Sequence, residues 1–162
     1  MKKERGFSLI ELLIVVAIIG TLAALAVPNF IRTRQAANEA SAVSAIRTIN
    51  SAQISYRFSS GNNVNFADSL ATLNNSGLID SLLASGNKSG YTFTCAGVAD
   101  TGAIPSYFDV IANPNSRGIF GTGIRSFASN ETYLIYQRSD ANIVAGSPPP
   151  AYRTPANTVP LQ

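Results

Sequence analysis

GFSLIELLIVVAIIGTLAALAVPNF, from Gly6 to Phe30, is the stretch of sequence that decides the fold. From Phe7 onward it has 24 residues, and roughly 20 helical residues suffice to cross the hydrocarbon core of a bilayer. Glu11 lies inside this stretch, and no Lys or Arg follows it before Arg32. A carboxylate deep in a membrane segment costs roughly 2.5–3.5 kcal/mol on insertion scales and is usually functional. Any reading of this stretch must therefore account for Glu11.

The leader MKKERG precedes the apolar stretch and supplies a short basic head. A secretory signal would use these basic residues, with the small residues Ala24 and Ala26 marking its cleavage site. A plain membrane anchor would need only the length of the apolar run. Neither interpretation gives Glu11 a role.

A third interpretation rests on a resemblance carried by Gly6, Phe7 and Glu11. A basic leader ending in Gly, then Phe, then an apolar helix with Glu as its fifth residue resembles the class III signal of type IV prepilins and pseudopilins. Gly20 and Pro28 stand at the positions where the N-terminal helix of that family is loosened. The resemblance covers about 25 residues. Although this motif is short, it is a specific signal of the family.

The resemblance implies a fate for the N-terminus and a role for Glu11. A membrane aspartyl peptidase, the prepilin peptidase, is expected to cut between Gly6 and Phe7 on the cytoplasmic side and to methylate the new amine of Phe7. This amine stays cationic and is the expected partner of Glu11 in a neighbouring subunit. Opposite charges attract far more strongly in a low dielectric than in water, and an unpaired charge there is penalised. Glu11 would then set the register of assembly. Gly20 and Pro28 would loosen the helix on assembly, or Pro28 would simply kink it at the membrane exit, and the sequence leaves both interpretations open.

Beyond the apolar stretch the helical pattern continues to about Phe58 with fewer apolar residues. An apolar stripe at helical spacing predicts that this half packs on a globular head, and Arg32 and Arg34 are expected near lipid head groups. A helix from Phe7 to Phe58 would be roughly 75–80 Å long at about 1.5 Å per residue. We expect Gly61 to end it. The stripe comprises Ala42, Val43, Ile46, Ile49, Gln53 and Tyr56.

The rest of the chain predicts a small head of short helices and strands. The runs FADSLATL and LIDSLLASG indicate two short helices, with Gly77 between them and Gly86 as a C-cap. The strands are expected to form an antiparallel sheet with one face on the long helix and the other in water. Asn130-Glu131 is expected to form a tight hairpin. The four predicted strands are Tyr91–Ala96, Tyr107–Ala112, Ile124–Ser129 and Tyr133–Gln137.

The predicted fold class is therefore α+β, a type IV pilin-like lollipop with a sheet of about four strands on the outer half of the long helix. The tail GSPPPAYRTPANTVPLQ holds five prolines and is expected to be extended or disordered. The expected organisation is a leader at 1–6, a hydrophobic helix at 7–29, its amphipathic half at 30–58, a connecting region at 59–90, the sheet at 91–140 and the tail at 141–162.

Composition argues against catalysis and against nucleic-acid binding. The chain has no His, and its carboxylates show no spacing typical of a calcium loop or a glycosidase pair. Residues 7–162 carry nine basic and eight acidic side chains, so no basic face is predicted. Cys95 is the single cysteine and is expected to be a buried small hydrophobe. We expect no enzyme, no cofactor and no metal site.

The resemblance favours a structural protein, the major pilin of a type IV pilus. Its expected partners are other copies in a homopolymeric filament, the prepilin peptidase, an inner-membrane assembly platform and the membrane before assembly. The basic leader places the N-terminus in the cytoplasm. The chain would span the bacterial inner membrane once and later be extracellular in the pilus.

Two alternatives stay open: a major pseudopilin of a type II secretion system, and a minor pilin for DNA uptake or adhesion. Many type IV pilins close their last loop with a Cys pair, and major pseudopilins usually bind calcium there through acidic residues. This sequence has one Cys and, after Ser129, only Glu131 and Asp140. The sequence therefore confirms neither subfamily beyond its N-terminal third, and its stretch LIDSLLASGNKSGYTFT resembles small disulfide-free pilins.

Overall fold

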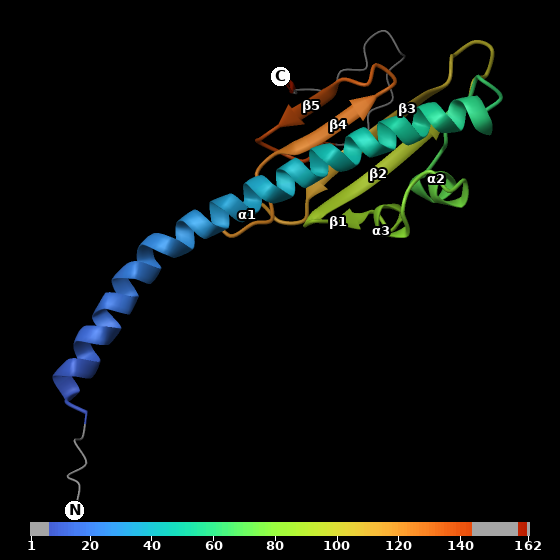
Figure 1. The fold of residues 1–162 in the computed structure, drawn as a ribbon. Coiled ribbons are helices and arrows are strands. Elements are labelled where there is room, and N and C mark those ends of the chain that lie inside the picture. Colours follow the sequence, from blue (N-terminus) through green and yellow to red (C-terminus); the bar gives the residue numbers. More distant parts are fainter. Residues whose placement is uncertain (1–6, 144–158, 162) are drawn as a thin grey trace, which may run out of the picture.

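The computed structural model describes residues 7–143 and 159–161. It is an α+β lollipop in which the long helix α1 (Leu9–Ser59) extends far beyond a compact head (Figure 1). Among the described residues the head contains a six-stranded antiparallel sheet, so the predicted fold class is confirmed with two more strands than expected. The remaining elements are α2 (Leu70–Asn75), α3 (Ser81–Ala84), β1 (Asn87–Lys88), β2 (Tyr91–Val98), β3 (Tyr107–Pro114), β4 (Ser126–Asn130), β5 (Ile135–Arg138) and β6 (Val159–Pro160).

Helix α1 is unbroken from Leu9 to Ser59, two residues later at its start than the sequence predicts. Ser60 caps its end, with the Ser60 N–H donating to the Tyr56 carbonyl at 2.8 Å. Gly61 follows directly, and a Cβ there would lie 2.0 Å from the Asn65 carbonyl oxygen. The chain therefore turns so tightly after α1 that only glycine fits, and Gly61 stands at the helix end as predicted.

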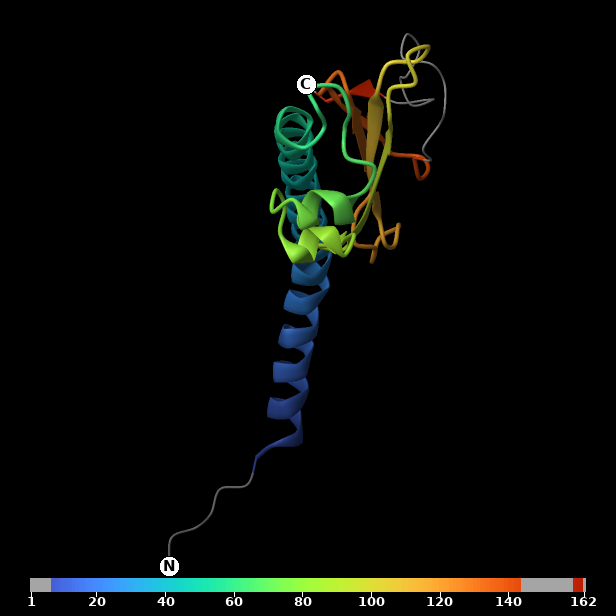
Figure 2. The same cartoon turned by 90° about the vertical axis from the view of Figure 1, so that its right-hand side faces the viewer.

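The two short helices form where the sequence predicts them, because each has a side-chain cap. The Ser69 hydroxyl accepts from the Thr72 N–H at 3.2 Å at the start of α2. The Asp80 carboxylate accepts from the Leu83 N–H at 2.6 Å at the start of α3. Both helices lie beside α1 on the same side of the sheet (Figure 2).

The sheet is a simple meander in which each strand pairs with the next one in the chain. The longest pairing joins β2 and β3 from Tyr91↔Pro114 to Val98↔Tyr107. Figure 2 shows the sheet nearly edge-on, with the upper half of α1 lying along one face. The main core fills the space between helix and sheet. Its largest fully buried side chains include Tyr91, Phe108, Phe127, Ile46, Ile49, Leu73 and Leu83.

The predicted stripe on α1 is the face that packs on the head. Ala42, Ile46, Ile49 and Gln53 are fully buried. Val43 and Tyr56 of the stripe are partly buried at the edge of this core. The period of 3.6 residues thus identified the buried face from sequence.

Two expectations for the sheet are wrong: the tight hairpin at Asn130-Glu131, and a sheet with one face in water, which does not hold for β4. The β4–β5 connection is a four-residue loop, because the Tyr133 N–H bonds to the Asn130 carbonyl at 2.8 Å and Tyr133 adopts φ +61. The Asn130 side chain also accepts from the Thr132 N–H at 3.1 Å. This side-chain turn extends the connection beyond Asn130-Glu131. Strand β4 is buried along its whole length, since Ile143 covers Ala128 and Ile111 on the outer face.

The tail is not wholly without regular structure. Strand β6 pairs with β5 through Gln137↔Val159 and Tyr136↔Pro160, and the Leu161 N–H donates to the Ile135 carbonyl at 2.7 Å. Pro160 is tolerated because β6 lies at the edge of the sheet. Residues 144–158 of the predicted extended tail lie outside the described residues.

Candidate functional site

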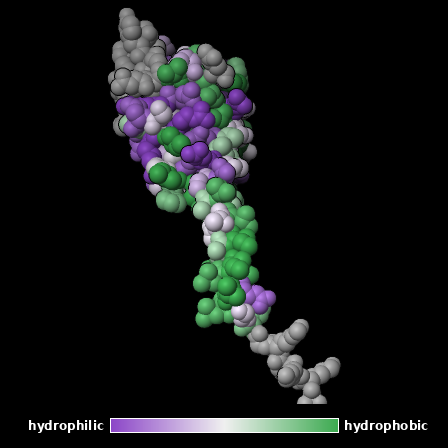
Figure 3. Space-filling model, turned by 90° about the vertical axis from the view of Figure 1, so that its left-hand side faces the viewer, coloured by the Kyte–Doolittle hydropathy of each residue, from purple (hydrophilic) through white to green (hydrophobic). Residues whose placement is uncertain are grey.

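The N-terminal half of α1 carries the residues that the sequence singles out, and nothing in the described chain covers it. Every residue from Phe7 to Phe30 is exposed. Figure 3 shows this half as a hydrophobic stalk that reaches the lower end of the head. By length and composition it is the one helix among the described residues that can cross a membrane. An apolar surface of this extent needs lipid or other protein around it in water.

Glu11 lies in the first turn of α1 and is exposed, and no ion pair within residues 7–143 and 159–161 involves it. Phe7 and Ser8 precede the helix, and Ser8 is its N-cap in an extended conformation. The main-chain nitrogen of Phe7 therefore lies outside the helical ladder, free of the i to i+4 bonding pattern. Gly6, the other half of the predicted cleavage site, lies outside the described residues.

Gly20 and Pro28 do not interrupt α1 in the single chain. Pro28 has no N–H to donate, which removes one bond of the ladder. One residue later the Asn29 side-chain amide donates to the Leu25 carbonyl at 3.2 Å. No other atom of the described chain lies within 4 Å of a Cβ built on Gly20, beyond its own helix. Loosening of this segment on assembly remains a prediction.

The upper half of α1 holds the head through a polar latch, defined here as Gln35, Asn38 and Glu39. The Glu39 carboxylate is 6% exposed and accepts from the backbone N–H groups of Ile124 and Arg125 at 2.9 and 3.1 Å. The Arg125 guanidinium completes the site, with its Nη2 atom 2.6 Å from Glu39 Oε2. A buried carboxylate needs such partners on every oxygen.

The other two latch residues hold the loop between β3 and β4. The Gln35 amide donates to the carbonyls of Gly118 at 2.9 Å and Gly121 at 3.1 Å. The Asn38 amide donates to the Thr122 carbonyl at 2.8 Å. Three side chains within about one turn of α1 thus fix the height of this loop along the helix.

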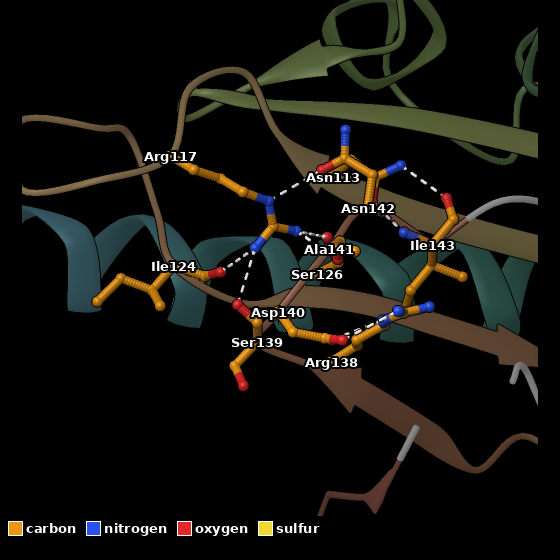
Figure 4. Close-up of polar contacts among 10 residues, drawn as sticks. All are labelled: Asn113, Arg117, Ile124, Ser126, Arg138, Ser139, Asp140, Ala141, Asn142 and Ile143. Carbon is orange, nitrogen blue, oxygen red and sulfur yellow. Dashed lines mark hydrogen bonds and ion pairs between the residues drawn. The ribbon is translucent and has the colours of Figure 1, made fainter. Parts of the chain in front are cut away.

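Arg117 fastens the segment after β5 to the sheet (Figure 4). Its Nε atom donates to the Asn142 side chain at 3.0 Å and its Nη2 atom to the Ala141 carbonyl at 2.7 Å. It also bonds to the Ile124 carbonyl and the Ser126 hydroxyl. A planar guanidinium with five donors suits such a junction of several acceptors.

Asn113 forms a second clamp a few residues away (Figure 4). Its amide nitrogen donates to the Ile143 carbonyl, and its amide oxygen accepts from the Ile143 N–H, both at 2.9 Å. This side chain pairs with the backbone as a neighbouring strand would. Arg117 and Asn113 together hold residues 139–143 against the outer face of β3 and β4.

Cys95 lies where β2 passes α1 and is bonded within the core. The Gln53 amide donates to the Ala67 carbonyl at 3.0 Å and to Cys95 Sγ at 3.2 Å, and the Ala67 N–H donates back to Gln53 at 2.8 Å. Burial raises the pKa of the Cys95 thiol to about 12, because the thiolate would lose its solvation. The thiol is partly buried at the edge of the core, where the sequence predicted a buried small hydrophobe.

Sequence reasoning missed the latch and the clamps. Glu39 and Arg125 are 86 positions apart, and no local pattern joins them. One signal was present: Gln35, Asn38 and Glu39 recur at i, i+3 and i+4, which places them on one helix face. Polar residues on such a face are ordinarily taken as solvent-facing, so only the tertiary structure identifies them as buried contacts.

The comparisons with known proteins bear on the stalk first. The family model described as the prokaryotic N-terminal methylation motif matches residues 1–27. The type IV major pilin protein PilA of Myxococcus xanthus is 48% identical over 54 residues, which is 33% of this chain and 24% of that protein. The type II secretion system core protein G of Escherichia coli is 35% identical over 89 residues, which is 55% of this chain and 61% of that protein. The N-terminal part of the chain is therefore similar to type IV pilins and pseudopilins.

The match with both branches of the family is partial. The type IV wide pilus major component PilA4 of Thermus thermophilus is 54% identical over 39 residues, 24% of this chain and 30% of that protein. The chain spans between about a quarter and three fifths of the length of these three relatives. No solved structure matches it significantly. The matches of 39 to 89 residues leave a large part of the head without a counterpart in these relatives, so that part must be understood from its own contacts.

Proposed function

We propose that this pilin-family chain is the repeating subunit of a type IV pilus and acts by assembly rather than catalysis. The observation that carries the proposal is the fully exposed apolar half of α1 with Glu11 in its first turn. In a single copy this surface faces water, so it requires a bilayer before assembly and other copies of the same helix afterwards. The similarity to major pilins of two bacteria supports a pilus subunit.

Maturation would begin with cleavage between Gly6 and Phe7 by a prepilin peptidase, followed by methylation of the Phe7 amine. The chain would wait in the bacterial inner membrane until an assembly platform extracts it. In the growing filament the Phe7 amine of one subunit would pair with Glu11 of its neighbour. An incoming helix out of register would leave both charges unpaired in an apolar core, so only the correct register is favoured.

Two measurements test this proposal directly. Mass spectrometry of the mature protein is expected to show methylated Phe7 as the first residue. The substitution Glu11→Ala is expected to give processed protein that stays in the membrane and yields few sheared fibres. Thr21→Ala is the matched control, because the Thr21 hydroxyl bonds only within its own helix, to the Ile18 carbonyl at 2.8 Å. Wild-type fibre yield with Glu11→Ala would remove the pairing argument.

A pseudopilin of a type II secretion system is the second candidate. The observation that favours it is the match to core protein G of Escherichia coli, which extends over 55% of the chain and so beyond the N-terminal helix. Deletion of the gene separates the two functions. Loss of surface fibres with intact secretion supports the pilus, and loss of secreted enzymes with intact fibres supports the pseudopilin.

A further inference from the structure

The loop between β3 and β4 presents an apolar tip to solvent. Ile119 is 78% exposed and Phe120 is 82% exposed, which makes them the most exposed large apolar residues of the head in the described part of the chain. Hydrogen bonds hold this tip in a fixed position. Gln35 bonds to carbonyls on both sides of it, and the Gly121 N–H bonds to the Gly118 carbonyl at 3.0 Å. A fixed, exposed Ile-Phe pair calls for a partner surface.

The tip faces the stalk end of the head. Ile119 lines an open cleft of about 630 Å³ with Pro28 and Arg32 on one wall. Gln35, which holds the loop, lies seven positions beyond Pro28, so the cleft opens from the latch toward the N-terminal half of α1. Figure 3 shows the hydrophobic surface of the stalk continuing onto the lower end of the head.

The height of the cleft along α1 matches the surface of a membrane. At about 1.5 Å per residue, a hydrocarbon core of roughly 30 Å takes about 20 residues, from Phe7 to about Val27. A head-group layer of roughly 5–7 Å then reaches about as far as Arg32. Ile119 faces these same residues of α1 across the cleft. Whenever the helix spans the bilayer, lipid head groups therefore surround the tip.

The charges around the tip suit an anionic lipid surface. Arg32 and Arg34 are both exposed on α1 at this height. Asp140 is the acidic residue of the cleft, and its carboxylate is paired with Arg138 at 2.6 Å. Basic residues near anionic lipids are attracted, and an apolar tip below them enters the boundary between head groups and acyl chains.

We propose that the Gly118–Gly121 loop docks into the outer head-group layer of the membrane that α1 spans, giving each unassembled subunit a second membrane contact. This inference rests on the proposed membrane-anchored state. One helix alone leaves the whole subunit free to tilt in the bilayer and to rotate about the helix axis, whereas a helix and a loop tip together define the orientation of the head. The head would then meet the assembly machinery in a fixed orientation relative to the membrane. On extraction into a filament the tip would leave the lipid.

The sequence offers a clean probe, because the chain contains no Trp. Three single-Trp variants of the full chain are reconstituted into vesicles of phosphatidylethanolamine and phosphatidylglycerol with brominated acyl chains. Phe120→Trp reports the tip, and Leu22→Trp reports the span. Ile104→Trp is the matched control, an exposed apolar residue in the loop between β2 and β3 at the opposite end of the head (Figure 1).

On reconstitution into the vesicles, the emission of Phe120→Trp is expected to shift to the blue and to be quenched by the brominated chains, at every protein-to-lipid ratio. The emission of Ile104→Trp is expected to show neither change. Phe120→Trp as exposed as Ile104→Trp, with Leu22→Trp quenched, overturns the docking and leaves the anchored state intact. A Phe120→Trp blue shift that grows with protein density, without bromine quenching, assigns the tip to a second copy and also overturns it. Absence of quenching in Leu22→Trp would overturn the anchored state and the docking together.

Discussion

Replacing Glu39 with Ala is expected to destabilise the head and to loosen the segment before β4 from the upper half of α1. The Glu39 carboxylate is almost wholly buried and accepts two backbone N–H groups, from Ile124 and Arg125. It also accepts from the Arg125 side chain at 2.8 Å through Nε and at 2.6 Å through Nη2. No other side chain of α1 joins the helix to the start of β4 through as many bonds in the described residues.

The magnitude follows from the groups that lose their partner. Each backbone N–H left without an acceptor costs about 1–3 kcal/mol when buried. The Arg125 side chain is 43% exposed, so water replaces part of its lost ion pair, and the loss stays below the roughly 3–5 kcal/mol of a fully buried pair. We expect Glu39→Ala to lower the free energy of unfolding by about 3 kcal/mol. Glu39→Gln keeps an oxygen for the two N–H groups and is expected to lose about half of that.

The assay is urea unfolding of the full chain in a nonionic detergent, followed by the near-ultraviolet circular dichroism of the buried tyrosines. Hydrogen exchange of the Ile124 and Arg125 amides gives a local readout. Arg47→Ala is the control, since Arg47 is exposed on the same helix. A loss for Glu39→Ala within about 0.5 kcal/mol, the usual range of surface changes, with unchanged exchange at both amides, would refute the reasoning.

Three further predictions concern the head. Arg117→Met is expected to lower the free energy of unfolding by about 2 kcal/mol through its lost charged hydrogen bonds, and to expose residues 139–143 to limited proteolysis; an unchanged cleavage pattern contradicts the clamp. Cys95 is expected to resist iodoacetamide at pH 8 in the folded chain and to react in urea, because its raised pKa keeps the thiol neutral. Because the pKa of Cys95 is higher in the folded chain than in the unfolded chain, the neutral thiol contributes to stability. This contribution is complete below the unfolded pKa and is lost as pH rises toward about 12. A urea midpoint that rises between pH 9 and 11 would contradict this assignment. Gly61→Ala is expected to destabilise the end of α1 by at least about 1 kcal/mol, since its Cβ would lie 2.0 Å from the Asn65 carbonyl oxygen; a wild-type urea midpoint would show that the turn can relax.

The parts of the fold that depend on local pattern were predictable from sequence. The stripe containing Ile46 and Ile49 identified the buried face of α1, and Gly86 marked the end of α3. Strands β2 and β3 have strong local signals. Strands β1 and β6 have two residues each, so their existence depends on pairing with a neighbour and leaves no periodic signal.

The parts that depend on distant partners were not predictable. The tight hairpin was wrong because the Asn130 side chain stabilises a longer turn through Thr132. Alternation along β4 was hidden because Ile143 covers its outer face. Glu39 and Arg117 carry the main polar junctions of the head, yet each is defined by residues far along the chain. In the stalk the motif at Gly6, Phe7 and Glu11 is local, which is why it could be read from sequence alone.

The order of the sheet also sets the order in which its edges become protected. Every strand from β1 to β5 needs only a short connection to find its neighbour, so these pairings form quickly. Strand β6 instead returns to β5 after the long segment 139–158. Until it does, β5 offers a bare row of backbone donors and acceptors to any strand nearby. Until β6 closes this edge, newly made copies can therefore pair with one another through β5.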